Sequence, residues 1–137
     1  MKVNFKNLEF VKKEIERLIK KVKFDNEVLA VILFGSSVRK QKYKNSDVDI
    51  CIVLRPNKYN SLRLSYKKLK YLKEFDFDIQ IFQQLPLYIR KRVIKEGKVL
   101  FCRNEDELYQ VVFKMIEEFA DFEHIYREYL EEVSNVR

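Results

Sequence analysis

The sequence predicts an α/β or α+β fold in which helices surround a small sheet. Short apolar runs of strand length alternate along the chain with longer segments whose apolar residues have helical spacing. In addition, 47% of the 137 residues are hydrophobic, which is enough for a packed core. We therefore expect residues 1–137 to form a single domain, with a core over about residues 27–102 and a long C-terminal helix over about 104–133.

Four segments have the spacing of amphipathic helices. They are residues 7–22, 60–73, 86–96 and 104–133. Asn60 or Ser61 can cap the second helix, and Asn104 begins a capping-box pattern for the last one. Pro86 suits the first turn of the third helix, which Gly97 terminates. The residues expected on the inner face of the second helix are Leu62, Leu69 and Leu72.

Four shorter runs are expected to form strands. They are residues 27–34, 47–54, 75–82 and 98–102. The first, EVLAVILF, is a continuous apolar run of the kind found in strands buried on both faces. The third, FDFDIQIF, alternates strictly between apolar and polar residues. The polar stretch 36–42, after the first strand, has room for a short helix.

The charge of the chain favours an anionic partner without identifying it. Lysine and arginine exceed aspartate and glutamate by 28 to 21, so the net charge is +7. A nucleotide, a nucleic acid or an acidic protein surface would each suit this excess. For the charge taken alone, a lysine-rich surface that only confers solubility is the favoured explanation.

The compartment is expected to be the cytoplasm. No apolar run approaches the roughly 20 residues that span a bilayer, and the N-terminal MKVNFKNLEF lacks the apolar core of a signal peptide. Cys51 lies within one apolar run and Cys102 follows another, as buried reduced thiols do. We expect no disulfide and no membrane partner.

Paired aspartates on two of the predicted strands indicate a metal site. Residues two apart on a strand point to the same face, so Asp47 and Asp49 project together, as do Asp76 and Asp78. If the two strands are neighbours, their carboxylates converge. Two carboxylates about 5 Å apart repel by roughly 3 kcal/mol at an effective dielectric constant of 20. A dication removes this cost, and oxygen ligands suit Mg²⁺ or Mn²⁺.

A glycine and a serine precede the first aspartate pair. Gly35 and Ser36 end the first predicted strand, where backbone N–H groups can approach an anion without a Cβ in the way. The segment is not a P-loop, because GSSVRKQK has no Gly-Lys-Ser/Thr ending. Phosphates held by this turn and a metal held by the aspartates together indicate a site that transfers part of a nucleoside triphosphate.

This arrangement resembles the signature of the polymerase-β-type nucleotidyltransferase superfamily. Its parts here are Gly35-Ser36, ten further residues, and then Asp47-x-Asp49. The chain is similar in particular to the minimal nucleotidyltransferases (MNT), the small prokaryotic partners of HEPN-domain toxins. The resemblance extends from about Ala30 to Phe101. It implies a mixed sheet flanked by helices.

The resemblance also implies roles for individual residues. Asp47, Asp49 and Asp78 would be the catalytic carboxylates and the ligands of Mg²⁺ or Mn²⁺. Asp78 would activate the attacking hydroxyl, either directly or through the metal. The residues expected to bind the nucleotide are Gly35, Ser36, Ser37 and Arg39. The family often has an arginine followed by a glycine after its Gly-Ser, and Val38-Arg39-Lys40 keeps only the arginine.

The activity implied is Mg²⁺-dependent transfer of AMP from ATP to a protein hydroxyl. The expected acceptor is a tyrosine of a cognate HEPN toxin, which would make this chain the antitoxin of a toxin–antitoxin pair. Two alternatives remain open. The chain could neutralise its toxin by binding alone, or it could be a nucleotidyltransferase acting on RNA ends or on a small molecule. Nucleic acid is the less favoured partner.

The choice between Asp76 and Asp78 needs a separate argument, because both lie on one face of FDFDIQIF. Asp78 is followed by the alternating IQIF, so it lies further into the strand, where packing can hold its carboxylate. Asp76 is nearer the start of the strand and is expected to be more solvated. We therefore predict that Asp78 is the third carboxylate.

Overall fold

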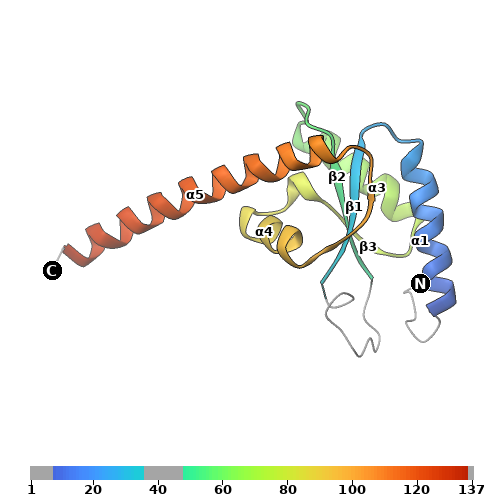
Figure 1. Ribbon diagram of the computed structural model, residues 1–137, viewed down its shortest axis with the longest axis horizontal. Coiled ribbons are helices and arrows are strands. Elements are labelled where there is room, and N and C mark those ends of the chain that lie inside the picture. Colours follow the sequence, from blue (N-terminus) through green and yellow to red (C-terminus); the bar gives the residue numbers. More distant parts are fainter. Residues whose placement is uncertain (1–7, 36–47, 136–137) are drawn as a thin grey trace.

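The computed structural model describes residues 8–35 and 48–135 (Figure 1). In chain order the elements are α1 (Leu8–Lys23), β1 (Val28–Phe34), β2 (Asp49–Leu54), α3 (Ser61–Glu74), β3 (Asp78–Ile81), a 3₁₀ turn η1 (Phe82–Gln84), α4 (Leu87–Glu96), β4 (Lys98–Cys102) and α5 (Glu105–Asn135). This order confirms the predicted alternation of helices and strands. The short helix expected within residues 36–42 lies outside the described residues.

The four strands form one mixed sheet in the order β3-β2-β1-β4. β1 is antiparallel to both of its neighbours, and β2 runs parallel to β3. Val28 to Val31 are completely buried, as the continuous apolar run of β1 predicts. Cys51 and Cys102 are not in a disulfide, which also agrees with the sequence.

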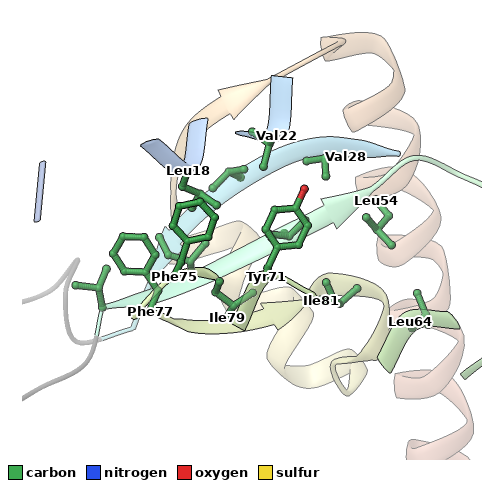
Figure 2. Packing of buried hydrophobic residues seen from close by; sticks show 14 of the residues in the cluster. Leu18, Val22, Val28, Leu54, Leu64, Tyr71, Phe75, Phe77, Ile79 and Ile81 are labelled. Atoms are coloured by element: carbon green, nitrogen blue, oxygen red, sulfur yellow. The ribbon is translucent and has the colours of Figure 1, made fainter. Parts of the chain in front are cut away.

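Helices cover both faces of the sheet. α1 and α3 pack on one face, where Figure 2 shows Leu18 and Val22 on the same side as Tyr71 and Ile79. α4 and the first half of α5 cover the other face. That second cluster contains Leu29, Ala30, Ile32, Cys51, Val53, Phe82, Val93 and Met115. None of the helices in residues 8–35 and 48–135 combines the length and apolar character needed to cross a membrane.

The third strand is shorter than predicted. β3 covers only Asp78–Ile81. The preceding helix α3 continues to Glu74, and the Phe75 N–H still belongs to its last turn, because it donates to the Tyr71 carbonyl. Phe75 and Phe77 are buried in the first cluster with their rings stacked, so they serve the core before the strand begins.

The inner face of α3 also differs from the prediction. All three predicted residues, Leu62, Leu69 and Leu72, are exposed. The buried residues of the helix are Leu64, Lys67 and Tyr71. Spacings of three and four place these three on one side of the helix. The apolar pattern did not reveal this face because one of its members is a lysine.

Lys67 is buried because two carboxylates from the α1–β1 connection neutralise it. Its side chain is 11% exposed, and Nζ lies 2.6 Å from Asp25 Oδ2 and 2.8 Å from Glu27 Oε1. The Tyr71 hydroxyl donates to Asp25 Oδ2 at 2.6 Å. Burial acts to raise the pKa of Asp25, but the hydrogen bonds from Lys67 and Tyr71 outweigh it and hold this pKa below its ordinary value. Hydrogen bonds from Lys67 and Arg63 lower the pKa of Glu27.

These two lowered pKa values predict how stability changes with pH. A carboxylate whose pKa is lower in the folded state stabilises the fold above its unfolded value, which is about 3.9 for aspartate and 4.3 for glutamate. The contribution of Asp25 and Glu27 is therefore complete above about pH 5 and is lost as the pH falls through their folded values. Urea unfolding should give a lower free energy of unfolding at pH 3.5 than at pH 6. The Asp25→Asn/Glu27→Gln variant should show a flatter dependence, and an unchanged slope in that variant would contradict the assignment.

Candidate active site

The structure brings Asp49 and Asp78 together at one end of the sheet. They are the first residues of the parallel strands β2 and β3, and they are direct partners in the register of the pair. Neighbouring strands lie about 4.8 Å apart. Ile50 and Ile79, the next residues, point into the core under α1 and α3. By alternation, both carboxylates lie on the opposite face, on the side of α4.

Asp76 is not part of this arrangement. It lies in the bend before β3, and no residue of β2 pairs with it. Its side chain is partly buried whereas that of Asp78 is exposed, so the prediction that Asp76 would be the more solvated was wrong. The strand begins at Asp78, whose N–H donates to the Val48 carbonyl at 2.9 Å. Register with Asp49, rather than burial, therefore distinguishes the two aspartates.

Gly35 lies against the carboxylate of Asp49. Its φ of +78° is in the left-handed region that favours glycine. A Cβ added to Gly35 would overlap with Asp49 Oδ2 and would lie 3.0 Å from Asp49 Cγ. The preceding residue, Phe34, pairs with Asp49 in the β1–β2 register. The glycine is needed both for the backbone conformation and for the close approach of the carboxylate.

Replacing Gly35 by alanine should therefore destabilise the fold. The left-handed conformation alone is expected to cost about 1–3 kcal/mol in the free energy of unfolding. The overlap with Asp49 adds to this cost, and the added part should disappear in Gly35→Ala/Asp49→Ala. Urea unfolding of the two single variants and the double variant gives a coupling energy, for which we expect about 0.5–3 kcal/mol. If the change in the free energy of unfolding of the double variant equals the sum of the changes in the single variants, the added Cβ does not clash with the Asp49 side chain.

Three of the seven predicted site residues, Gly35, Asp49 and Asp78, lie in the part of the chain that the structure describes. Asp47, Ser36, Ser37 and Arg39 lie outside the described residues, so their roles stay predictions. Within residues 8–35 and 48–135, no group of three or more histidine, cysteine, aspartate or glutamate side chains gathers as a metal site. Asp49 and Asp78 supply two oxygen donors on adjacent strands, a donor set that fits Mg²⁺ or Mn²⁺ with positions left for other ligands.

The structure adds a cation that the sequence did not indicate. A pocket of about 240 Å³ lies beside Gly35, and α4 contributes Arg92, Val93 and Glu96 to its lining. Arg92 Nε donates to Glu96 at 3.3 Å, in a solvent-exposed pair. Such pairs are weak, so the guanidinium can turn to an anionic group that enters the pocket. Its only signal in the sequence was the basic run YIRKRVIK, which also suits an ordinary amphipathic helix.

A larger pocket lies away from the aspartates. It has a volume of about 370 Å³, and its lining includes Arg55, Phe82, Arg90 and Met115. Arg55 follows the last residue of β2, whereas Asp49 is the first. At 3.3 Å per residue the two ends are about 20 Å apart, so this pocket is separate from the carboxylate pair.

Residues 13–106 match the family model described as "Polymerase beta, Nucleotidyltransferase". This match covers more than half of the chain, and the chain belongs to this nucleotidyltransferase family. The predicted superfamily is thereby confirmed.

One curated relative is similar over most of the chain. It is the Methanocaldococcus jannaschii protein named "Putative protein adenylyltransferase MJ1547". The two are 35% identical over 106 residues, which cover 75% of this chain and 79% of the relative.

Solved structures of toxin–antitoxin complexes contain chains of the same fold. One is described as a tri-AMPylated Shewanella oneidensis HEPN toxin in complex with MNT antitoxin, with a TM-score of 0.60, 17% identity, and coverage of 90% of this chain and 98% of that one. Another, a toxin–antitoxin with AMP-PNP, has a TM-score of 0.59, 20% identity, and coverage of 89% and 97%. At these identities the similarity establishes the fold alone, and it confirms the predicted polymerase-β-like architecture.

Proposed function

We propose that this chain transfers AMP from ATP to a hydroxyl group of a partner protein. The observation that carries the proposal is the pairing of Asp49 with Asp78 beside the Gly35 turn. Two carboxylates next to a glycine turn suit a metal-bound triphosphate. The relative named as a protein adenylyltransferase supports the choice of AMP and of a protein acceptor.

The acceptor side of the site is open. β3 is an edge strand, and the Asp78 side chain is exposed. A hydroxyl on the surface of another protein can therefore reach this carboxylate. Asp78 would accept the hydroxyl proton as the oxygen attacks the α-phosphorus, forming the new P–O bond while the bond to the β-phosphate breaks and pyrophosphate leaves.

Other residues would position the nucleotide. Asp47, Asp49 and Asp78 would hold Mg²⁺ or Mn²⁺, which when bound supplies a Lewis acid for the phosphate oxygens. The turn of Gly35, Ser36 and Ser37, together with Arg39, would bind the triphosphate through N–H, hydroxyl and guanidinium donors. Arg92 would add a second guanidinium from α4 for the charge that develops on the leaving pyrophosphate.

We infer further that the acceptor is a tyrosine of a HEPN toxin and that the chain acts in the cytoplasm as its antitoxin. This part rests on the sequence resemblance to the MNT proteins. It is in keeping with the complex described as a tri-AMPylated HEPN toxin with MNT antitoxin, whose chain shares this fold.

Intact-mass spectrometry tests the proposal. The purified chain is incubated with ATP, Mg²⁺ and a HEPN-domain toxin, and the expected product is that toxin carrying AMP on a tyrosine. Chelation by EDTA should stop the reaction, and Mn²⁺ should restore it. An unmodified toxin that is nonetheless inhibited would show neutralisation by binding alone. AMP found only on RNA ends or on a small molecule would replace the protein acceptor.

A further inference from the structure

The second half of α5 projects from the other elements that the structure describes. The first half packs on α4 and the sheet, with Met115 buried and Phe119 half-buried. From Ala120 to Ser134 every side chain is exposed. Figure 1 shows this part of the helix, in orange and red, extending away from the body of the protein. It is about 22 Å long at 1.5 Å per residue.

This exposed segment carries an apolar seam, which we define as Phe122, Tyr126, Tyr129 and Val133. It continues from Phe119 with spacings of three, four, three and four residues. That is the heptad spacing by which one helix packs against another. All four seam side chains are more than half exposed. The rings of Phe122 and Tyr126 stack on each other, with centroids 6.2 Å apart, which leaves their outer faces uncovered.

The exposed segment needs a covering surface for its stability. An isolated helix of about 15 residues is marginal in water, because most helical stability in proteins comes from packing of the apolar face. Contiguous exposed apolar surface of this kind marks interaction sites. The seam is therefore suited to packing against another protein surface.

The charge of α5 is opposite to that of the rest of the chain. Residues 105–135 contain ten acidic and two basic residues, a net charge of −8, whereas the remaining residues carry +15. Glu123 and Glu132 occupy positions that border the seam on the helix surface. Glu118 borders Phe119, the residue from which the seam continues. Ile125 and Leu130 occupy the other two bordering positions, so the edges carry both glutamate and aliphatic side chains, and the segment as a whole is acidic.

This charge disfavours a second copy of α5 as the covering surface. In a pair of such helices the bordering glutamates of one would face those of the other, and like charges at these positions destabilise pairing. A partner with lysine or arginine at the bordering positions would gain attraction instead.

We infer that the projecting half of α5 is a docking surface for a partner protein that presents an apolar helix or groove bordered by lysine and arginine. Binding here needs neither nucleotide nor metal. The inference therefore stands apart from AMP transfer, and either can fail without the other.

Two synthetic peptides test the inference. Both peptides consist of three heptads with leucine at the two apolar positions of each heptad. One peptide has lysine at the positions that border the leucines, and the other has glutamate there. Fluorescence anisotropy with the full chain should show the lysine peptide binding at least about 10-fold more tightly than the glutamate peptide. Phe122→Ala/Tyr129→Ala should weaken binding of the lysine peptide at least about 10-fold, because aromatic side chains at the centre of an interface contribute most. Alanine preserves helix propensity, and circular dichroism checks that the helix remains.

A matched pair of charge variants separates docking from general electrostatic attraction. Glu132→Gln removes a charge at the border of the seam, and Glu131→Gln removes the same charge on the outer face of the helix. Only Glu132→Gln should weaken the binding of the lysine peptide to the chain. Equal effects of the two, equal binding of both peptides, or binding of neither would overturn the inference. Analytical ultracentrifugation tests whether a second copy of the chain binds the seam instead. If the wild-type chain forms a dimer and Phe122→Ala/Tyr129→Ala dissociates it, the seam pairs two copies.

Discussion

Asp49→Asn should lower the rate of AMP transfer by at least about 100-fold, the effect of removing one group that stabilises charge in a transition state. Asparagine has the shape of aspartate but lacks its charge, so it is a poor ligand for a divalent ion. The fold should survive, because the variant also removes the repulsion between two carboxylates that face each other across β2 and β3. We therefore expect the variant to fold and to unfold cooperatively in urea.

Initial rates with ATP and Mg²⁺, together with urea unfolding, check both parts of this prediction. Asp76→Asn is the matched control, because it removes the same charge from the bend before β3 without touching the strand pair. Full activity of Asp49→Asn would exclude the proposed metal role.

Asp78→Ala should abolish AMP transfer, whereas Asp76→Ala should remain largely active. A general base contributes about 10²- to 10⁴-fold to a rate, so we expect a loss in that range for Asp78→Ala. The reason is the register of the parallel pair, in which Asp78 and not Asp76 is the partner of Asp49. Asp78 should matter more for the chemical step than for nucleotide binding, so Asp78→Ala should still bind ATP measurably.

Intact-mass spectrometry of the co-expressed toxin measures the transfer, and calorimetric titration with ATP and Mg²⁺ measures the binding. Both variants change a side chain outside the buried core, so both should fold. AMP adducts made by Asp78→Ala but not by Asp76→Ala would reverse the assignment. If Asp78→Ala no longer binds ATP, the Asp78 carboxylate serves mainly to hold the metal-bound nucleotide.

The order of helices and strands could be predicted because it depends on local patterns. The run 27–34 became β1 within one residue, and the predicted helix 104–133 became α5 with similar bounds. Both patterns reflect which side chains a segment must bury, and this information lies within the segment itself.

The inner face of α3 could not be predicted in the same way. Its buried Lys67 is stabilised by Asp25 and Glu27, which lie about 40 residues earlier in the chain. Only their proximity in the folded protein makes burial of the ammonium group favourable. A pattern of apolar residues assigns such a lysine to the surface.

The sequence by itself determined which residue types could form the site: a glycine after the first strand and aspartates near the starts of the two strands that follow. The glycine turn and the aspartates were evident from their spacing, and alternation along β2 and β3 followed from the strand period. Three features were decided only by the tertiary structure: the partnership of Asp49 with Asp78, the contact of Gly35 with Asp49, and the position of Arg92 in the pocket beside Gly35. The register of two strands is set by how their apolar side chains pack in the core, and here Ile50 and Ile52 lie level with Ile79 and Ile81. Because that packing joins segments about 30 residues apart, no local period could fix it.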